Sequence, residues 1–259
     1  MTHPPAAARI LLATALSATV LLGAAACSVD GRTAPGSGRT AASTSSSAGP
    51  AAEQSAALTA TQVRAALITE ADLGQPWVPT RGGATWRDGL LKASTEDADC
   101  QRLLDALYTE ELFGTPTGPG AASALDDSGT EAQLRYQVAA HRPADVDRTL
   151  AWLTSLPGRC GEFSAATTRG GVAHVQVSDL PLPEAGDARQ ALRVVLSGQT
   201  SDGAPAHLTM DLAAVRVGEN AITLTHGGYG DLAAEVTQTV VQLGTQRLTE
   251  IRKQGRAEV

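Results

Sequence analysis

The sequence predicts an α+β protein in which an antiparallel sheet of about five to seven strands packs against several helices. Two observations support this fold class. Between residues 120 and 226, outside a helical segment at residues 143–156, apolar and polar residues alternate with a period of two, and short turn sequences separate the alternating runs. Before residue 112 and after residue 231, apolar residues recur at helical spacing instead. Helices first, strands in the middle and a long C-terminal helix last favour layers over alternating βαβ units.

The first part of the folded region contains two predicted helices. Thr61–Leu73 has helical spacing, with Thr61 as its expected cap, and Gly74 ends it. Residues 78–95 are ambiguous, with hints of an extended segment. Asp99–Leu112 is the second expected helix.

The middle of the chain reads as a hairpin, a helix and a meander. The helix begins at Pro143 and is expected to run through Leu156, where Pro157 and Gly158 would stop it. The expected strands are Ala121–Leu125, Glu131–Ala140, Glu162–Thr168, Val172–Ser178, Gln190–Thr200, Ala206–Val217 and Ala221–His226. A long helix follows from Asp231, with Gly244 at a point where close packing is expected.

Residues 1–26 are predicted to be a lipoprotein signal peptide. The apolar run Ile10–Ala26 is short for a stable transmembrane helix and typical of a signal peptide. Ala24-Ala25-Ala26-Cys27 resembles a bacterial lipobox, in which the cysteine is acylated with fatty acids such as palmitate and becomes the mature N-terminus. Ala24 stands where leucine is usual. The alternative is ordinary secretion, which would leave Cys27 as a free thiol.

Residues 27–57 are predicted to be a disordered tether, and residues 58–259 a single folded domain. The tether is rich in Ser, Ala, Gly and Pro and has too little apolar surface to offset the entropy of ordering. A flexible coil of this length spans roughly 30 Å. The expected location is therefore the outer face of the cell membrane, where the acylated Cys27 contacts membrane lipid.

Cys100 and Cys160 are predicted to form a structural disulfide. If Cys27 is acylated, an even pair of cysteines remains outside the cytoplasm, each at the end of a predicted helix. In the chain-entropy model a bridge closing such a loop stabilises the fold by about 4 kcal/mol. The alternative, a reactive thiol, lacks a Cys-x-x-Cys pattern or a basic neighbour.

Charge and motifs exclude several function classes. The net charge is −7 and no basic stripe is visible, which argues against nucleic acid as a partner. His141, His174, His207 and His226 are not at metal-ligand spacing, and no nucleophile elbow or His-Glu-x-x-His motif occurs. We therefore expect no enzyme, no metal and no cofactor.

One set of polar residues suggests a ligand site. If the Leu and Val positions of the strands face the helices, the other face of the sheet carries donors and acceptors suited to a polar or anionic ligand. The candidate ligand-binding residues on this face are Arg135, His174, Arg193 and His207, with Gln137, Gln176, Thr209 and Asp211 beside them. The alternative is a solvated outer face without a ligand.

Three stretches resemble a known family. Residues 65–77 (AALITEADLGQPW) look like the opening helix, Asp-Leu and Trp of many lipoproteins from high-GC Gram-positive bacteria. Residues 213–224 (AAVRVGENAITL) resemble their penultimate hairpin, before a helix ending in residues 246–248 (QRL). With Cys100 before one helix and Cys160 after another, the arrangement is similar to the PknH-like extracellular sensor domain of actinobacteria.

The resemblance implies an antiparallel sheet flanked by helices, either two-layered or sandwiched, with a cleft proposed to bind a ligand. The leading functional hypothesis is a lipid-anchored extracytoplasmic protein with a sensor-like domain and no catalysis. Its ligand would be a small molecule or a cell-wall component, and a separate signalling protein would receive any signal. The alternatives are a carrier of an apolar cell-envelope molecule and a cell-wall-acting enzyme.

Overall fold

A computed structural model describes residues 57–84, 86–168, 171–199 and 203–257. The predicted signal peptide, Cys27 and the tether up to residue 56 lie outside the described residues. Among the described residues, no helix is both long and apolar enough to cross a membrane.

The described residues form one antiparallel sheet of nine strands, in the order β1-β3-β4-β9-β8-β7-β6-β5-β2. The antiparallel α+β fold is confirmed, but the predicted count of five to seven strands was too low. The two strands that were missed, β1 and β2, have three and two residues, too few to show an alternating pattern. The strands are β1 (Trp77–Pro79), β2 (Ala93–Ser94), β3 (Gly120–Asp127), β4 (Gln133–Ala140), β5 (Glu162–Thr167), β6 (Val172–Asp179), β7 (Ala188–Gln199), β8 (Pro205–Val217) and β9 (Asn220–Tyr229).

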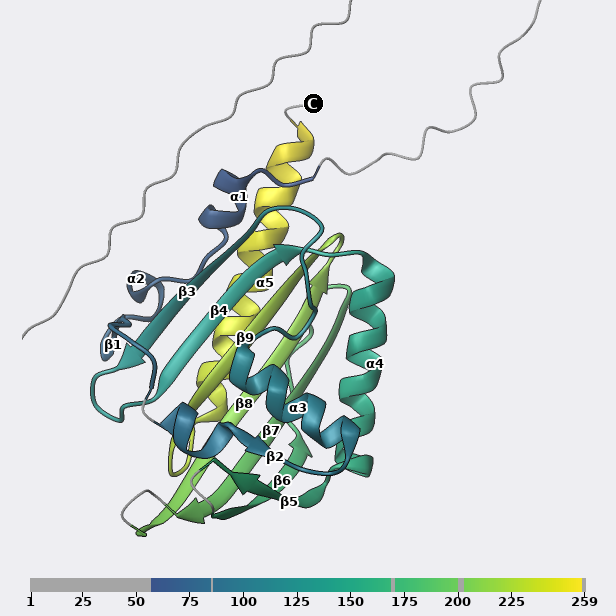
Figure 1. The fold of residues 1–259 in the computed structure, drawn as a ribbon. Coiled ribbons are helices and arrows are strands. Elements are labelled where there is room, and N and C mark those ends of the chain that lie inside the picture. The colour runs from purple at the N-terminus through teal and green to yellow at the C-terminus, as the bar shows by residue number, and fades with distance from the viewer. Residues whose placement is uncertain (1–56, 85, 169–170, 200–202, 258–259) are drawn as a thin grey trace, which may run out of the picture. The chain divides into compact units, whose positions relative to one another are not determined.

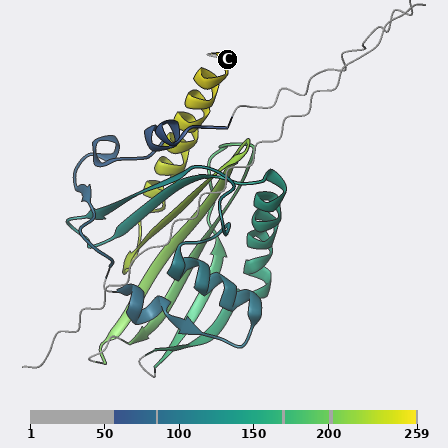
Figure 2. The same ribbon diagram turned by 45° about the horizontal axis from the view of Figure 1, so that its top comes forward.

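Helices cover both faces of the sheet. Figures 1 and 2 show α3 and α4 on one side of the strands and α1 and α5 on the other. The sequence led us to expect helices on one face and polar groups on the other, so this expectation was wrong. The helices are α1 (Ala60–Ala65), α2 (Glu70–Leu73), the π-helical turn η1 (Arg87–Leu91), α3 (Ala98–Thr109), α4 (Pro143–Arg159) and α5 (Ala234–Ala257).

The helix predicted over Thr61–Leu73 is two short helices. Thr59, rather than Thr61, caps α1, and its hydroxyl accepts the N–H of Gln62 at 3.2 Å. A second capping box begins at Thr69, whose N–H donates to Asp72 Oδ2 at 2.8 Å. Two caps in one stretch start two helices, which apolar spacing alone does not reveal.

The fourth helix runs past its predicted end. Pro157 lies inside α4, which ends at Arg159, so Pro157 and Gly158 do not stop it. The N–H of Cys160 donates to Leu156 O at 2.6 Å and closes the last turn. The cost of a proline is small there because only one backbone hydrogen bond is lost near the helix end.

Two apolar cores lie on the two sides of the sheet. The core under α3 and α4 includes Leu103, Leu107, Leu153, Leu156 and Leu192, which are all fully buried. The core under α1 and α5 includes Val63, Ile68, Tyr136, Val240 and Leu248, likewise 0% exposed. Strands sandwiched between two such layers bury side chains on both faces, as β8 and β9 do.

The predicted disulfide is present. Cys100 and Cys160 join the first turn of α3 to the residue that follows α4, with a Cα–Cα distance of 5.6 Å. Both cysteines are at most 2% exposed and belong to the core under these helices. The bridge therefore ties together the two helices of one layer.

Candidate functional site

The four residues predicted to bind a ligand do not share one face. Directly paired residues in an antiparallel sheet lie on the same face. In the register of the sheet, Arg135 on β4 stands opposite Thr225 on β9, and Thr225 stands opposite Leu212 on β8. Leu212 stands opposite Leu192 on β7, which is part of the core under α3 and α4. Arg135 therefore lies on the α3/α4 face of the sheet.

His174, Arg193 and His207 lie on the opposite face. His174 pairs with Ser197 and Ser197 pairs with His207, in one row across β6, β7 and β8. Arg193 is on the same face of β7 as Ser197, four residues away. The prediction of one polar face failed because apolar positions face α5 in β4 but face α3 and α4 in β6 and β7.

Arg135 is part of a closed ion cluster. Its guanidinium pairs with Glu110, which also pairs with Arg87 at 2.6 Å. The Glu110 side chain is only 9% exposed, and its backbone has a φ of 61°, which ends α3 in the left-handed conformation. Because Glu110 pairs with both guanidinium groups, the cluster connects α3 and η1 to the sheet.

Arg193 is likewise held by the protein. It donates two hydrogen bonds to Asp211, of 2.7 and 2.9 Å, and Asp211 is 0% exposed. The Thr237 hydroxyl donates to the same carboxylate at 2.9 Å, and His226 Nδ1 lies 3.2 Å from the Thr237 oxygen. This network fastens the first turns of α5 to β7, β8 and β9.

His174 and His207 are exposed, in one row of the sheet with Ser197. The Ser197 hydroxyl between them lies 3.2 Å from His207 Nδ1. A hydroxyl beside an imidazole is one element of a nucleophilic site, but such a site also needs a group that orients the base and donors for an oxyanion. Among the described residues, no carboxylate is hydrogen-bonded to His207.

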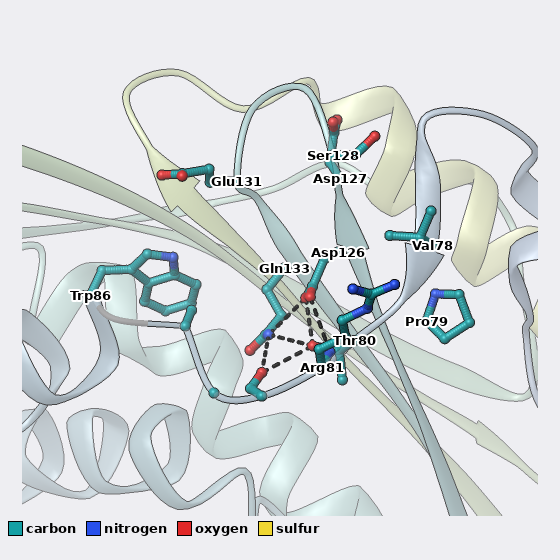
Figure 3. A pocket seen from close by; sticks show the side chains of 13 residues that line it. Val78, Pro79, Thr80, Arg81, Trp86, Asp126, Asp127, Ser128, Glu131 and Gln133 are labelled. Atoms are coloured by element: carbon teal, nitrogen blue, oxygen red, sulfur yellow. Dashed lines mark hydrogen bonds between the residues drawn. The ribbon is translucent and has the colours of Figure 1, made fainter.

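A large cavity lies elsewhere, at the end of the sheet where β1, β3 and β4 meet the segment before η1. Its volume is about 920 Å³, within the range of small-molecule sites. Figure 3 shows it between Trp86 on one side and Val78 and Pro79 on the other, with Asp126 and Gln133 at its centre. The loop of residues 80–84 forms one wall.

Asp126 holds that loop in place. Its carboxylate accepts the Thr80 hydroxyl at 2.6 Å, the Gln133 side-chain amide at 2.9 Å and the backbone N–H of Arg81 at 3.4 Å. The Gln133 amide also donates to the carbonyl of Gly82 at 3.0 Å. This hydrogen-bonded group joins the loop to β3 and β4 and makes the cavity a preformed feature.

Trp86 contributes a buried donor without a partner. The residue is 3% exposed, and its indole Nε1 has no hydrogen-bond partner among the described residues. Figure 3 shows the nitrogen on the side of the ring that faces Glu131 and Gln133. Leaving a buried N–H unpaired costs about 1–3 kcal/mol, so an acceptor from a bound molecule would be stabilising here.

Two further carboxylates lie at the turn between β3 and β4. Asp127 Oδ1 accepts the N–H groups of Gly129 at 2.7 Å and Thr130 at 3.1 Å. Glu131 follows with a φ of 58° and an exposed side chain. In the sequence, the cavity is indicated only by Gly82-Gly83 and Trp86, within the ambiguous residues 78–95. These residues do not show which strands the segment packs against.

A smaller cavity of about 380 Å³ lies over β4 and β9 beside α3. Gln137, another predicted polar-face residue, lines it and donates to the carbonyl of Glu110 at 3.1 Å. His141, which also lines it, is 7% exposed and packs its ring 5.4 Å from that of Phe113. Burial lowers the pKa of His141, so its imidazole is neutral at pH 7.

Comparison with known proteins finds likeness at the level of fold. No protein-family model and no curated protein matches the chain. The extracellular domain of PknH from Mycobacterium tuberculosis superposes with a TM-score of 0.42 and 12% identity, covering 76% of this chain and 97% of that domain. An uncharacterized protein from Mycobacterium smegmatis gives 0.40 and 13%, covering 75% of this chain and 99% of its own. Both TM-scores are below 0.5 and both identities below 25%, so neither likeness assigns this chain a family or a role.

Proposed function

We propose that this protein is a lipid-anchored, extracytoplasmic binding protein that holds a small ligand in the cavity beside Trp86. The observation that carries the proposal is the cavity itself, which combines about 920 Å³ of space with a buried, unpaired indole N–H. Cavities of this size with a few placed polar groups are the usual form of ligand sites. The binding role requires no catalytic group.

Two features support a location outside the cytoplasm. The lipobox-like sequence ending in Cys27 is typical of an acylated N-terminus. The Cys100–Cys160 bridge is the kind of disulfide that persists in oxidising compartments. A lipid anchor followed by a tether would hold the folded part near the outer face of the membrane, where the cavity would meet envelope or environmental molecules.

The cavity proposal can be tested by filling the site. Gly83 lines the cavity and has open space where a Cβ would lie, so Gly83→Phe adds bulk there without a clash of its first carbon. We expect native mass spectrometry of the protein purified from its own membranes to show a bound small molecule that Gly83→Phe loses.

The matched control is Gly158→Phe near the end of α4, where a Cβ also meets open space. This variant carries the same added side chain far from the cavity and should retain the bound molecule. The proposed binding role would be contradicted if both variants retained the bound molecule equally, or if the wild-type protein carried no bound molecule.

A further inference from the structure

The charges around the cavity indicate which class of ligand it takes. The charged side chains that line it are the carboxylates of Asp126, Asp127 and Glu131 and the guanidinium of Arg81, which leaves two net negative charges. None of these three carboxylates forms an ion pair within the part of the chain that the structure describes. An anionic ligand would face repulsion here, whereas a cation would be attracted.

The arrangement favours an organic cation over a metal ion. Among the described residues, the only group of ligand atoms close enough to hold a metal is that of Asp97 with the two bridged cysteines, not the carboxylates of the cavity. The oxygens of Asp126 are also occupied by the Thr80, Arg81 and Gln133 donors. The negative charge is therefore spread along the wall rather than gathered on one point.

The unpaired indole N–H adds a second requirement. Trp86 is only 3% exposed, and its Nε1–H group can act only as a hydrogen-bond donor. A ligand that satisfies it must bring an acceptor oxygen, such as a carbonyl or hydroxyl. Carboxylates along the wall and a buried donor on one side together select a molecule with a positive group and a neutral acceptor.

We propose that the cavity beside Trp86 binds small organic molecules that carry a primary ammonium group and a neutral acceptor oxygen. The ammonium group lies toward Glu131, and the acceptor receives the Trp86 N–H. This assignment rests on the proposed binding function and names the ligand chemistry of the same site.

A matched pair of probes tests the charge. Nα-acetyl-lysine methylamide has a fully charged ammonium at pH 7 and two amide carbonyls. Nα-acetyl-norleucine methylamide keeps the carbonyls and the four side-chain carbons but lacks the ammonium. The chain has three tryptophans, so the indole N–H resonance of Trp86 is readily assigned by Trp86→Phe. We expect the lysine probe to shift this resonance and to bind at least about tenfold more tightly than the norleucine probe, with the difference shrinking at high salt.

Charge-removing variants test the assigned carboxylates. Asp127→Asn keeps a side-chain oxygen that can accept the N–H groups of Gly129 and Thr130. The Glu131 side chain is exposed, so Glu131→Gln disturbs no packing. The double variant therefore removes two negative charges while retaining the turn. We expect this pair to weaken the lysine probe at least about tenfold and to leave the norleucine probe unchanged. The control, Glu96→Gln with Glu111→Gln, changes the net charge equally away from the cavity and should leave binding of both probes unchanged.

The outcomes separate the two proposals. Equal binding of both probes would overturn the ammonium assignment while leaving the binding function in place. The assignment would also be overturned if Asp127→Asn with Glu131→Gln left binding of the lysine probe unchanged. It would be overturned, too, if neither probe shifted the Trp86 indole resonance. A failed proposed function is recognised independently, by the lack of a bound molecule in protein from its own membranes.

Discussion

At the scale of single residues, His226 is a neutral imidazole held under α5. It is 2% exposed, and burial lowers its pKa from 6.5 to about 4, although the nearby Asp211 carboxylate opposes this shift and Arg193 adds to it. Its Nδ1 lies 3.2 Å from the Thr237 hydroxyl, which in turn donates to Asp211. The residue therefore has a structural role in the network that fastens α5, and its protonation would disturb that network.

The depressed pKa predicts a loss of stability in mild acid. The unfolded chain binds a proton at His226 below about pH 6.5, while the folded chain does so only near pH 4, so stability is present above 6.5 and falls as the pH drops through this window. By pH 5 the loss from His226 alone should be about 2 kcal/mol. Urea unfolding at pH 7 and pH 5 measures it.

The comparison with His226→Gln isolates the contribution of this residue. Glutamine has no charge to gain, so the variant should lose about 2 kcal/mol less than the wild type between pH 7 and pH 5. Burial also lowers the pKa of His141, so the free energy of unfolding of both proteins will still depend on pH to some extent. Parallel pH dependence of the wild type and His226→Gln would show that His226 is not neutral in the fold.

At the scale of elements, apolar spacing predicted most of the secondary structure. The strands β3 to β9 and the helices α3 to α5 lie within a few residues of their expected ranges. The errors have local causes. A capping box formed by Thr69 and Asp72 starts a second helix where one was expected, and β1 and β2 are too short to show an alternating pattern.

The close packing expected at Gly244 is present, where α5 crosses β4. A Cβ at this position would lie 2.4 Å from Tyr136 Oη and 2.7 Å from Cε2 of the same ring. Tyr136 is 0% exposed, its hydroxyl has no partner among the described residues, and burial raises its pKa. A side chain at Gly244 must therefore displace either the ring or the helix.

Gly244→Ala should lower the free energy of unfolding by about 1–3 kcal/mol, the usual cost of overpacking a core. Gly158→Ala is the matched control because a Cβ there meets open space in another helix, and alanine should stabilise that variant by up to about 1 kcal/mol. Combining Gly244→Ala with Tyr136→Phe removes the nearest atom and should restore part of the loss. Urea midpoints at pH 7 measure all three, and a neutral Gly244→Ala would refute the close contact.

At the scale of the whole molecule, the sequence predicted the fold class but not the site. Alternation shows that a strand has an apolar side, but not which of two helical layers that side meets. Arg135 and Arg193 therefore looked alike in sequence and lie on opposite faces, each paired with its own carboxylate. The cavity joins Trp86 to Asp126 and Gln133 across about 40 residues of chain, a distance that no local pattern spans.

The proposed acylation of Cys27 concerns the whole molecule, because a lipid anchor would determine where the folded domain works. A cysteine that carries two acyl chains anchors a protein stably. Cys27→Ala should therefore lose incorporation of a clickable fatty acid and move the protein from the membrane fraction to the soluble fraction. Immunoblots of both fractions and in-gel fluorescence measure this.

The chain provides its own control for this experiment. The double variant Cys100→Ala with Cys160→Ala removes the disulfide, which closes a loop with a sequence separation of 60, and should lower the stability by about 2–4 kcal/mol. It keeps Cys27, so it should still take up the fatty acid and stay with the membrane. If instead Cys27→Ala stayed in the membrane fraction with its label, the anchor would lie elsewhere and the lipobox interpretation would fail, while the cavity and its ligand would be unaffected.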